Sequence, residues 1–514
     1  MLNYSLKPFN RLISSKKAQQ VAPYLLGALA VLGFAPFYIF PLTILSLAGL
    51  CYLWMKAANA KAAFKLGFSY GLGLYVVGIY WIYISLHDFG GMPWWFAGFS
   101  TFCLCAFMAL FVGLVGWASK KLGSPIISIA VLWGLSDWIR CWIFTGFPWL
   151  TMGYSQAPHS PLAGYMPLVG VYGVSVIAVF VAALIASWFA NPSQNSAWKR
   201  NVIAAFVLII VTGNVLKIID WTTPVGSVIN VALVQGNISQ TEKWSPEKAQ
   251  STIDQYLSMV IASKAELIIL PETALPVLSS QLDPSVKQIL KAHAKQNNGD
   301  IIVGMVEYNE GSNNTVGEYF NSAISFGNNP TQTYSKNHLV PFGEFIPLKQ
   351  VFGWIYRDWL NMPLSDLSRG GTHQTPMNLV NQKVAVNICY EDVFGEEIIR
   401  QLPEATLLVN ISNDAWYGQS YAASQHMQFS QARALETGRF MLRATNTGVT
   451  AVIDPHGYVL AHAPHDVQTT LDVTAHGYSG STPYVHWGNW PFIVFCFAVL
   501  ISLLGLKVRE KSRL

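Results

Sequence analysis

Three polar residues whose types together carry out acyl transfer stand at the ends of short apolar runs in this 514-residue chain. Glu272 follows the run LIIL, Lys336 lies in YSKNHLV, and Cys389 ends VAVNIC. A thiol has a reference pKa of about 8.5, so at neutral pH it needs a base to become a nucleophile. A carboxylate can take the thiol proton, and an ammonium can stabilise both the thiolate and an oxyanion. Glu272, Lys336 and Cys389 are therefore a complete set for acyl transfer through a thioester.

Cys389 differs from the other cysteines in its surroundings. It alone lies in the large polar region, so it has no local disulfide partner; the others lie in long apolar segments, at Cys51, Cys103, Cys105, Cys141 and Cys496. Taken singly, each candidate also has an ordinary structural role: a small buried side chain for Cys389, a helix cap for Glu272 and a solvated loop residue for Lys336. The combination, with its flanking sequences, favours catalysis.

Residues 224–480 contain the elements that would position these side chains. Short β-branched runs alternate with amphipathic helical patterns, which predicts a layered α/β domain with a sheet core. Ser245-Pro246 and Asp283-Pro284 each predict a helix start, and a third helix is expected over 421–438. The predicted strands are 228–234, 267–270, 301–306, 323–326, 384–388, 406–411, 450–453 and 469–473.

The rest of the chain has the composition of a membrane protein. Hydrophobic residues make up 52% of the chain and charged residues 11%, whereas soluble domains are about 25% charged. A helix needs roughly 20 apolar residues to span a bilayer. Eight segments are candidates: 21–38, 40–56, 66–86, 93–118, 124–143, 165–190, 201–219 and 491–507. We expect seven transmembrane helices within 1–220, a catalytic domain at 224–480, and an eighth helix with a cytoplasmic tail at 488–514.

Basic residues predict the orientation of these helices. If the chain crosses the membrane eight times, the N-terminus, the C-terminal tail and every loop between helices that carries Lys or Arg lie on the same side. These residues are Lys7, Arg11, Lys16, Lys17, Lys56, Lys61, Lys65, Lys120, Lys121, Lys199, Arg200, Lys507, Arg509, Lys511 and Arg513. The opposite loops 37–41, 87–94 and 145–165 carry none. By the positive-inside rule the basic side is cytoplasmic, so the polar domain is expected outside.

Several functions are disfavoured by the same sequence. A formal net charge of +5, dispersed between apolar segments, does not indicate a nucleic-acid partner. The histidines of the polar region show no metal-ligand spacing such as His-Glu-x-x-His, so no metal site is expected. These histidines are His338, His373, His426, His456 and His462.

Four motifs together resemble the carbon–nitrogen hydrolase (nitrilase) superfamily. They are, in chain order, LPETALP, YSKNHLVPFGEFIP, NICYED and ISNDAWYG. That superfamily folds as a four-layer αββα sandwich and uses a Glu-Lys-Cys triad. The multi-span frame and the terminal TPYVHWGNWP narrow the resemblance to the bacterial apolipoprotein N-acyltransferases, over the whole chain.

The resemblance implies a role for each site residue. Glu272 matches the general base, Lys336 the oxyanion-stabilising lysine and Cys389 the nucleophile. Glu344, in PFGEF, matches a second glutamate that supports the triad. Tyr390 and Glu391 match residues beside the nucleophile that shape the site.

The resemblance also implies a ping-pong reaction without a cofactor. Cys389 would take an acyl chain from the sn-1 position of a phospholipid, typically phosphatidylethanolamine. The thioester would pass the chain to the α-amine of an S-diacylglyceryl cysteine on an apolipoprotein. The implied location is the bacterial inner membrane, with a periplasmic catalytic domain and cytoplasmic termini, and we expect a monomer by analogy.

Other polar and aromatic residues have two interpretations each. Trp244 and Trp416 are either aromatic loop residues over the site or interfacial anchors of the domain on the bilayer. Asp137 and Arg140 interrupt an apolar segment three residues apart, so they share a helix face. A structural ion pair is the favoured interpretation, and contact of Arg140 with a lipid headgroup is the alternative.

Two other functions compete with acyl transfer to lipoproteins. A membrane-tethered amidase or nitrilase would use the same triad with water as the acceptor and would release ammonia from soluble amides; a tether, however, needs one helix rather than eight. A transporter or receptor with a non-catalytic outer domain is disfavoured by the intact triad. Unchanged function of a Cys389→Ala protein in cells would favour it.

Overall fold

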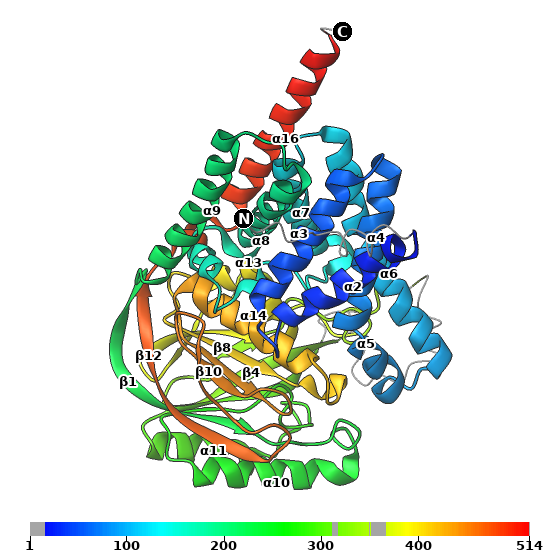
Figure 1. Ribbon diagram of the computed structural model, residues 1–514. Helices are drawn as coiled ribbons and strands as arrows, with labels where there is room; N and C mark the ends of the chain where they lie inside the picture. The colour runs from blue at the N-terminus through cyan, green and yellow to red at the C-terminus, as the bar shows by residue number, and fades with distance from the viewer. Residues whose placement is uncertain (1–15, 311–316, 349, 351–365, 513–514) are drawn as a thin grey trace.

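The computed structural model describes residues 16–310, 317–348, 350 and 366–512 of the chain. The basic residues Lys7, Arg11 and Arg513, which contribute to the predicted orientation, lie outside these ranges. Apolar helices form one end of the molecule and an α/β sandwich forms the other, with β1 and β12 running along one edge of the sandwich toward the helices (Figure 1).

All eight apolar segments predicted from the sequence are largely helical. Four helices are long and apolar enough to span a membrane: α6, α8 with the turn before it, α9 and α16. The bent pair formed by α4 and the segment Trp81–Phe89 counts as a fifth. The described residues therefore support four or five spans by length, against eight predicted. The helices are α2 (Lys16–Ala30), α3 (Phe40–Lys56), α4 (Ala60–Gly78), α5 (Trp81–Ile84), α6 (Trp94–Leu122), α7 (Pro125–Arg140), α8 (Met166–Ala190), α9 (Ser196–Lys217) and α16 (Trp490–Lys511).

The α/β part contains two six-stranded sheets. The first has the order β12-β1-β2-β3-β4-β5 and the second β11-β10-β9-β8-β7-β6. In the first sheet β1 pairs in parallel with β2 and β2 with β3; in the second, β7 pairs in parallel with β8 and β8 with β9. The strands are β1 (Thr222–Gln235), β2 (Leu267–Ile269), β3 (Asp300–Asn309), β4 (Glu318–Gly327), β5 (Thr333–Ser335), β6 (Met377–Leu379), β7 (Gln382–Ile388), β8 (Leu407–Ser412), β9 (Met441–Thr445), β10 (Ala451–Ile453), β11 (Val459–His462) and β12 (Thr469–Gly480).

The sheets pack face to face between two layers of helices, which is the expected αββα order. Side chains such as Leu233 and Val386 from the two inner faces share one apolar core. Helices α10 (Pro246–Ala262) and α11 (Pro284–Gln296) cover the outer face of the first sheet. Helices α13 (Gly395–Ile398) and α14 (Ala422–Thr437) cover the outer face of the second. Figure 1 shows α14 between the second sheet and the apolar helices.

The eight predicted strands and three predicted helices are all present. Asp283 caps α11 by accepting a hydrogen bond from the backbone N–H of Ser285, and α14 ends at Gly438 in the left-handed region with a φ of 64°. The strands β5, β6, β9 and β11 were not predicted; each has five residues or fewer. The three-residue strand β5 matters most, because Lys336 follows it directly.

Candidate active site

Lys336 lies between two carboxylates at one end of the first sheet. Its Nζ is 2.8 Å from Oε1 of Glu344 and 3.4 Å from Oε1 of Glu272, the residue reached just after β2. Asn321 of β4 donates its side-chain N–H groups to the same two oxygens, at 2.7 Å for Glu272 and 2.9 Å for Glu344. Burial opposes the charge on Lys336, but Glu344 and Glu272 outweigh it and raise its pKa above the ordinary value. Lys336 is therefore an ammonium that holds both glutamates in place.

Cys389 ends β7 and begins a short 3-10 turn, η6 (Cys389–Val393), with a φ of 52°. This left-handed conformation is uncommon for a residue with a Cβ, and it sets the side chain at a sharp strand-to-turn corner. Burial raises the pKa of the Cys389 thiol well above its usual value; Glu272 raises it further, and Lys336 lowers it. The resting sulfur therefore keeps its proton, and among charged residues Glu272 has the largest effect on its pKa.

Glu391 ties the turn of the nucleophile to the segment that carries Lys336. Its carboxylate accepts hydrogen bonds from the backbone N–H of Ile388 at 2.7 Å, of Asn337 at 2.7 Å and of His338 at 3.1 Å. The hydroxyl of Tyr334 donates to both of its oxygens at 3.0 Å. Burial raises the pKa of Glu391 to about 7, against these backbone donors, which lower it. Through these hydrogen bonds Glu391 holds the end of β5 and the turn η6 together, and we call it the brace between β5 and η6.

Tyr390 connects the site to the loop between α7 and α8. Its hydroxyl donates to the carbonyl of Gly146 at 2.8 Å, and its ring stacks on Trp149 with a centroid distance of 5.8 Å. His338 also contacts this loop, through a 2.9 Å hydrogen bond between Nε2 and the carbonyl of Thr145. The residues beside the nucleophile are thus packed directly against the helical part of the molecule.

The structure places the remaining predicted residues in different settings. Trp416 is half-buried and contacts the ring of Phe89 from the helical part at 6.4 Å, and Trp244 is half-buried in the turn before α10. These positions fit both interpretations of the two tryptophans. Arg140 is buried, paired with Asp137, and donates to the carbonyl of Trp149 at 3.1 Å. The contacts of Arg140 fit the structural ion pair that the sequence favours, and its contact with a headgroup stays a prediction.

Lys243 is a second buried lysine near the site that the sequence analysis missed. Its Nζ donates to the main-chain carbonyl of Glu272 at 3.0 Å, and its side chain is almost fully enclosed. Burial lowers the pKa of Lys243 to about 8, although Glu272 and Cys389 act to raise it. The sequence signal was its place beside Trp244 in the motif TEKW, but a lysine in a polar turn is usually solvated.

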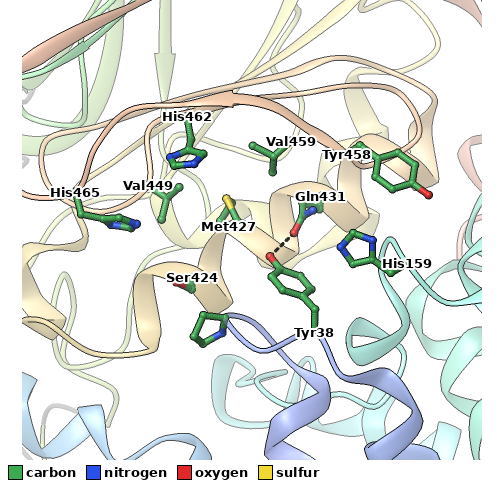
Figure 2. A pocket seen from close by; sticks show the side chains of 11 residues that line it. Tyr38, His159, Ser424, Met427, Gln431, Val449, Tyr458, Val459, His462 and His465 are labelled. Atoms are coloured by element: carbon green, nitrogen blue, oxygen red, sulfur yellow. Dashed lines mark hydrogen bonds between the residues drawn. The ribbon is translucent and has the colours of Figure 1, made fainter.

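A hollow of about 310 Å³ lies beside α14 (Figure 2). Met427 and Gln431 of α14 line it, and the hydroxyl of Tyr38 donates to Oε1 of Gln431 at 2.8 Å. His426, on another face of the same helix, contacts the turn of the nucleophile. Cys389 is not among the residues that line this hollow.

Cys389, Asp414 and His426 have a sulfur, an oxygen and a nitrogen within 4.8 Å of one another, a spacing that a metal ion could use. Their other contacts do not fit such a role. Nδ1 of His426 is 2.7 Å from Asp414, and Nε2 is 2.9 Å from Asp392, so both ring nitrogens face carboxylates. The second oxygen of Asp414 is 3.0 Å from the guanidinium of Arg443. An imidazole that donates from both nitrogens has no lone pair left for a metal.

Comparison with known proteins agrees with this architecture. Residues 26–184 match the family model described as apolipoprotein N-acyltransferase N-terminal domain, and residues 230–484 match the carbon–nitrogen hydrolase model. An apolipoprotein N-acyltransferase of Nitrosomonas europaea is 47% identical, over 94% of this chain and 96% of its own length. That of Chromobacterium violaceum is 41% identical, over 96% and 95%. A solved carbon–nitrogen hydrolase from Helicobacter pylori covers 52% of this chain and 94% of its own, with 15% identity and a TM-score of 0.34.

Proposed function

Because the chain belongs to the apolipoprotein N-acyltransferase family, and is thus an acyltransferase of lipoprotein biosynthesis that works at a membrane, we propose that Cys389, Glu272 and Lys336 are its reacting groups. The observation that carries the proposal is the convergence of Glu272 and Lys336, from the first sheet, on a cysteine held at a strand end of the second. Glu272 and Lys336 are also the two charged residues with the largest effects on the Cys389 thiol.

In the first half-reaction Glu272 takes the thiol proton and the sulfur of Cys389 attacks the ester carbonyl of a phospholipid. The ammonium of Lys336 stabilises the negative charge that develops on the carbonyl oxygen, together with the backbone N–H that follows the cysteine. The ester bond then breaks, and Glu272 returns its proton to the leaving oxygen. The products are a thioester on Cys389 and a lysophospholipid.

In the second half-reaction the α-amine of the diacylglyceryl cysteine of an apolipoprotein attacks the thioester. Glu272 accepts a proton from the amine, the carbon–sulfur bond breaks, and an amide forms while the thiol is restored. A buried site favours the amine over water, because it excludes the competing nucleophile. Glu344 acts as a positioning residue here, since it holds the ammonium of Lys336 at 2.8 Å.

The finer features of the predicted enzyme belong to the same proposal. The donor is phosphatidylethanolamine, and its sn-1 chain is transferred. The chain divides into helices at 1–220, a catalytic domain at 224–480 and a last helix at 488–514, with eight spans in the inner membrane. The catalytic domain is periplasmic, both termini are cytoplasmic, and the enzyme is a monomer. Tyr390 and Glu391 shape the site, while Trp244 and Trp416 lie over it or anchor it.

Mass spectrometry of the enzyme incubated with phospholipid alone tests the proposal. We expect an acyl adduct on the peptide that contains Cys389, with release of lysophospholipid and no acceptor present. A Cys389→Ala protein should form no adduct, whereas a Cys103→Ala protein, changed at an exposed cysteine, should react like the wild type. An adduct on another residue, or none on the wild type, would contradict the assignment of Cys389.

A further inference from the structure

Next to Cys389, four buried charged residues from the second-sheet half of the domain form a closed ring. His426 lies 2.9 Å from Asp392 and 2.7 Å from Asp414, and Arg443 lies 3.0 Å from the second oxygen of each aspartate. The side chains of all four are at most 2% exposed. We call Asp392, His426, Asp414 and Arg443 the charge ring. With two positive and two negative members it has no net charge.

The protonation state of His426 follows from its neighbours. Each ring nitrogen faces a carboxylate, and a carboxylate can only accept, so both nitrogens carry hydrogen. Burial and Arg443 lower the pKa of His426, but Asp392 and Asp414 outweigh them and raise it to about 9. The rings of Trp149 and Phe429 also lie near the imidazole, at 6.3 and 6.4 Å, and neither titrates; the titratable thiol of Cys389 lies within 4.8 Å of a His426 nitrogen.

The charge ring contacts the nucleophile at two points. Nε2 of His426 is 3.1 Å from the carbonyl oxygen of Cys389, which also accepts a 3.1 Å hydrogen bond from Asn410. These two hydrogen bonds fix the peptide group between Cys389 and Tyr390, directly after the residue with the left-handed φ. The cysteine sulfur, an oxygen of Asp414 and a nitrogen of His426 also lie within 4.8 Å of one another. A buried carboxylate at that distance disfavours a thiolate unless a cation compensates it.

We propose that His426 is a positioning residue for the nucleophile. As a permanent imidazolium it holds the carbonyl of Cys389 and offsets the negative charge of Asp414 at the sulfur, which leaves ionisation of the thiol under the control of Glu272 and Lys336. The ring members come from four elements: Asp392 from η6, Asp414 from η8 (Asp414–Tyr417), His426 from α14 and Arg443 from β9. The ring thereby fixes the corner at Cys389 to the body of the second sheet. This inference deepens the proposed role of Cys389 and rests on it.

Two double variants that each keep the ring neutral test the idea. His426→Gln with Asp392→Asn leaves Asp414 beside the sulfur without its imidazolium. His426→Gln with Asp414→Asn removes that carboxylate as well. If His426 compensates Asp414, the first variant raises the apparent pKa of Cys389 by about one unit, so the thiol reacts about tenfold more slowly at neutral pH. The second variant leaves the apparent pKa of Cys389 unchanged. If the ring is only a scaffold, the two variants behave alike, and this result would overturn the proposal.

The readout is the pH dependence of modification of Cys389 by methyl methanethiosulfonate, a small neutral thiol reagent, followed on the peptide by mass spectrometry. This measurement needs no lipid substrate, so its failure is distinct from failure of the donor-only adduct. His293→Gln, in α11 on the far side of the first sheet, is the matched control and should leave the profile unchanged.

If neither double variant folds, the wild-type protein still decides the matter. Ordinary histidines have a pKa of about 6.5 and are neutral at pH 8. A nitrogen NMR spectrum of ¹⁵N-histidine-labelled enzyme in lipid at pH 8 must then show an imidazolium signal that persists. A spectrum with only neutral imidazole signals at that pH would overturn the proposal.

Discussion

Cys389 lies between two charged clusters that differ in their balance of charge. On the first-sheet side Lys336 meets Glu272 and Glu344, so one ammonium faces two carboxylates. On the second-sheet side the charge ring has two cations and two anions. A cluster with one excess negative charge can accept a proton at little electrostatic cost, whereas a balanced ring cannot accept or release one without creating a buried net charge. Under the proposed mechanism the first cluster moves protons and the charge ring holds the geometry of Cys389.

The two clusters also differ in exposure. The side chains of Glu272 and Glu344 are 9% and 14% exposed, while both aspartates of the charge ring are completely buried. The first cluster is therefore in contact with solvent and the second is not. The following variants test this division of roles, beginning with the one expected to have the largest effect.

Replacing the base should abolish most of the activity. In Glu272→Gln the carboxyl oxygen that accepts from Asn321 is kept, but the group can no longer take the thiol proton. We expect the rate of adduct formation on Cys389 to fall by about 10²–10⁴-fold. Glu247→Gln, on the exposed first turn of α10, serves as the control and should match the wild type. A Glu272→Gln enzyme with more than a tenth of the wild-type rate would mean that another group removes the proton.

Neutralising Glu344 should remove the excess negative charge while leaving the base in place. In Glu344→Gln the ammonium of Lys336 attracts Glu272 alone, which then accepts the thiol proton less readily. We expect a loss of about 10–100-fold in the rate of adduct formation, a smaller effect than for Glu272→Gln. Folding is checked by the melting temperature in detergent. Equal losses for the two variants would instead make both glutamates part of one proton-transfer unit.

The sequence predicted one cluster and missed the other for a physical reason. Glu272 and Cys389 each follow an apolar run, so the pattern places them at strand ends, whereas Lys336 was identified through its motif YSKNHLVPFGEFIP. The four members of the charge ring lie on four elements between residues 392 and 443, and in the sequence nothing distinguishes each of them from an ordinary polar residue. Only the packing of α14 against the second sheet brings His426 to the carbonyl of Cys389.

The same contrast holds for the fold. The sandwich was predictable because its central strands are β-branched runs long enough to recognise. The short strands β5, β6, β9 and β11 lack such a pattern, and the three residues of β5 carry no signal of their own. The number of membrane spans was harder to predict, because α7 has 16 residues and α3 has 17, fewer than a bilayer requires of a straight helix.

Removing the brace between β5 and η6 should have a moderate effect on both activity and stability. In Glu391→Gln one side-chain oxygen becomes an N–H₂ group. It faces either the donors Ile388 and Tyr334 or the donors Asn337, His338 and Tyr334, depending on the orientation of the amide. Because an unpaired buried donor costs about 1–3 kcal/mol, we expect a lower melting temperature and about tenfold slower adduct formation. Tyr334→Phe removes one donor only and should show a smaller loss. Unchanged melting temperature in Glu391→Gln would show that the brace does not hold the site.

The pH dependence of stability should give the smallest effect and distinguish the charge ring directly. The pKa of His426 is raised from 6.5 to about 9 in the folded protein. A group whose pKa is raised by folding stabilises the fold fully below its unfolded pKa, and this contribution is lost as the pH rises through the folded value. The wild type should therefore lose this contribution between about pH 6.5 and pH 9.

His426→Gln with Asp392→Asn lacks the titrating group, so the difference in melting temperature between the two proteins should shrink steadily over that range. Groups away from the charge ring cancel in the difference, and Cys389, whose pKa burial raises well above its usual value, keeps its proton over this range in both proteins. A difference that stays constant up to pH 10 would mean that His426 is neutral in the folded enzyme, and the contrast between a proton-moving side and a fixed side of Cys389 would then fail.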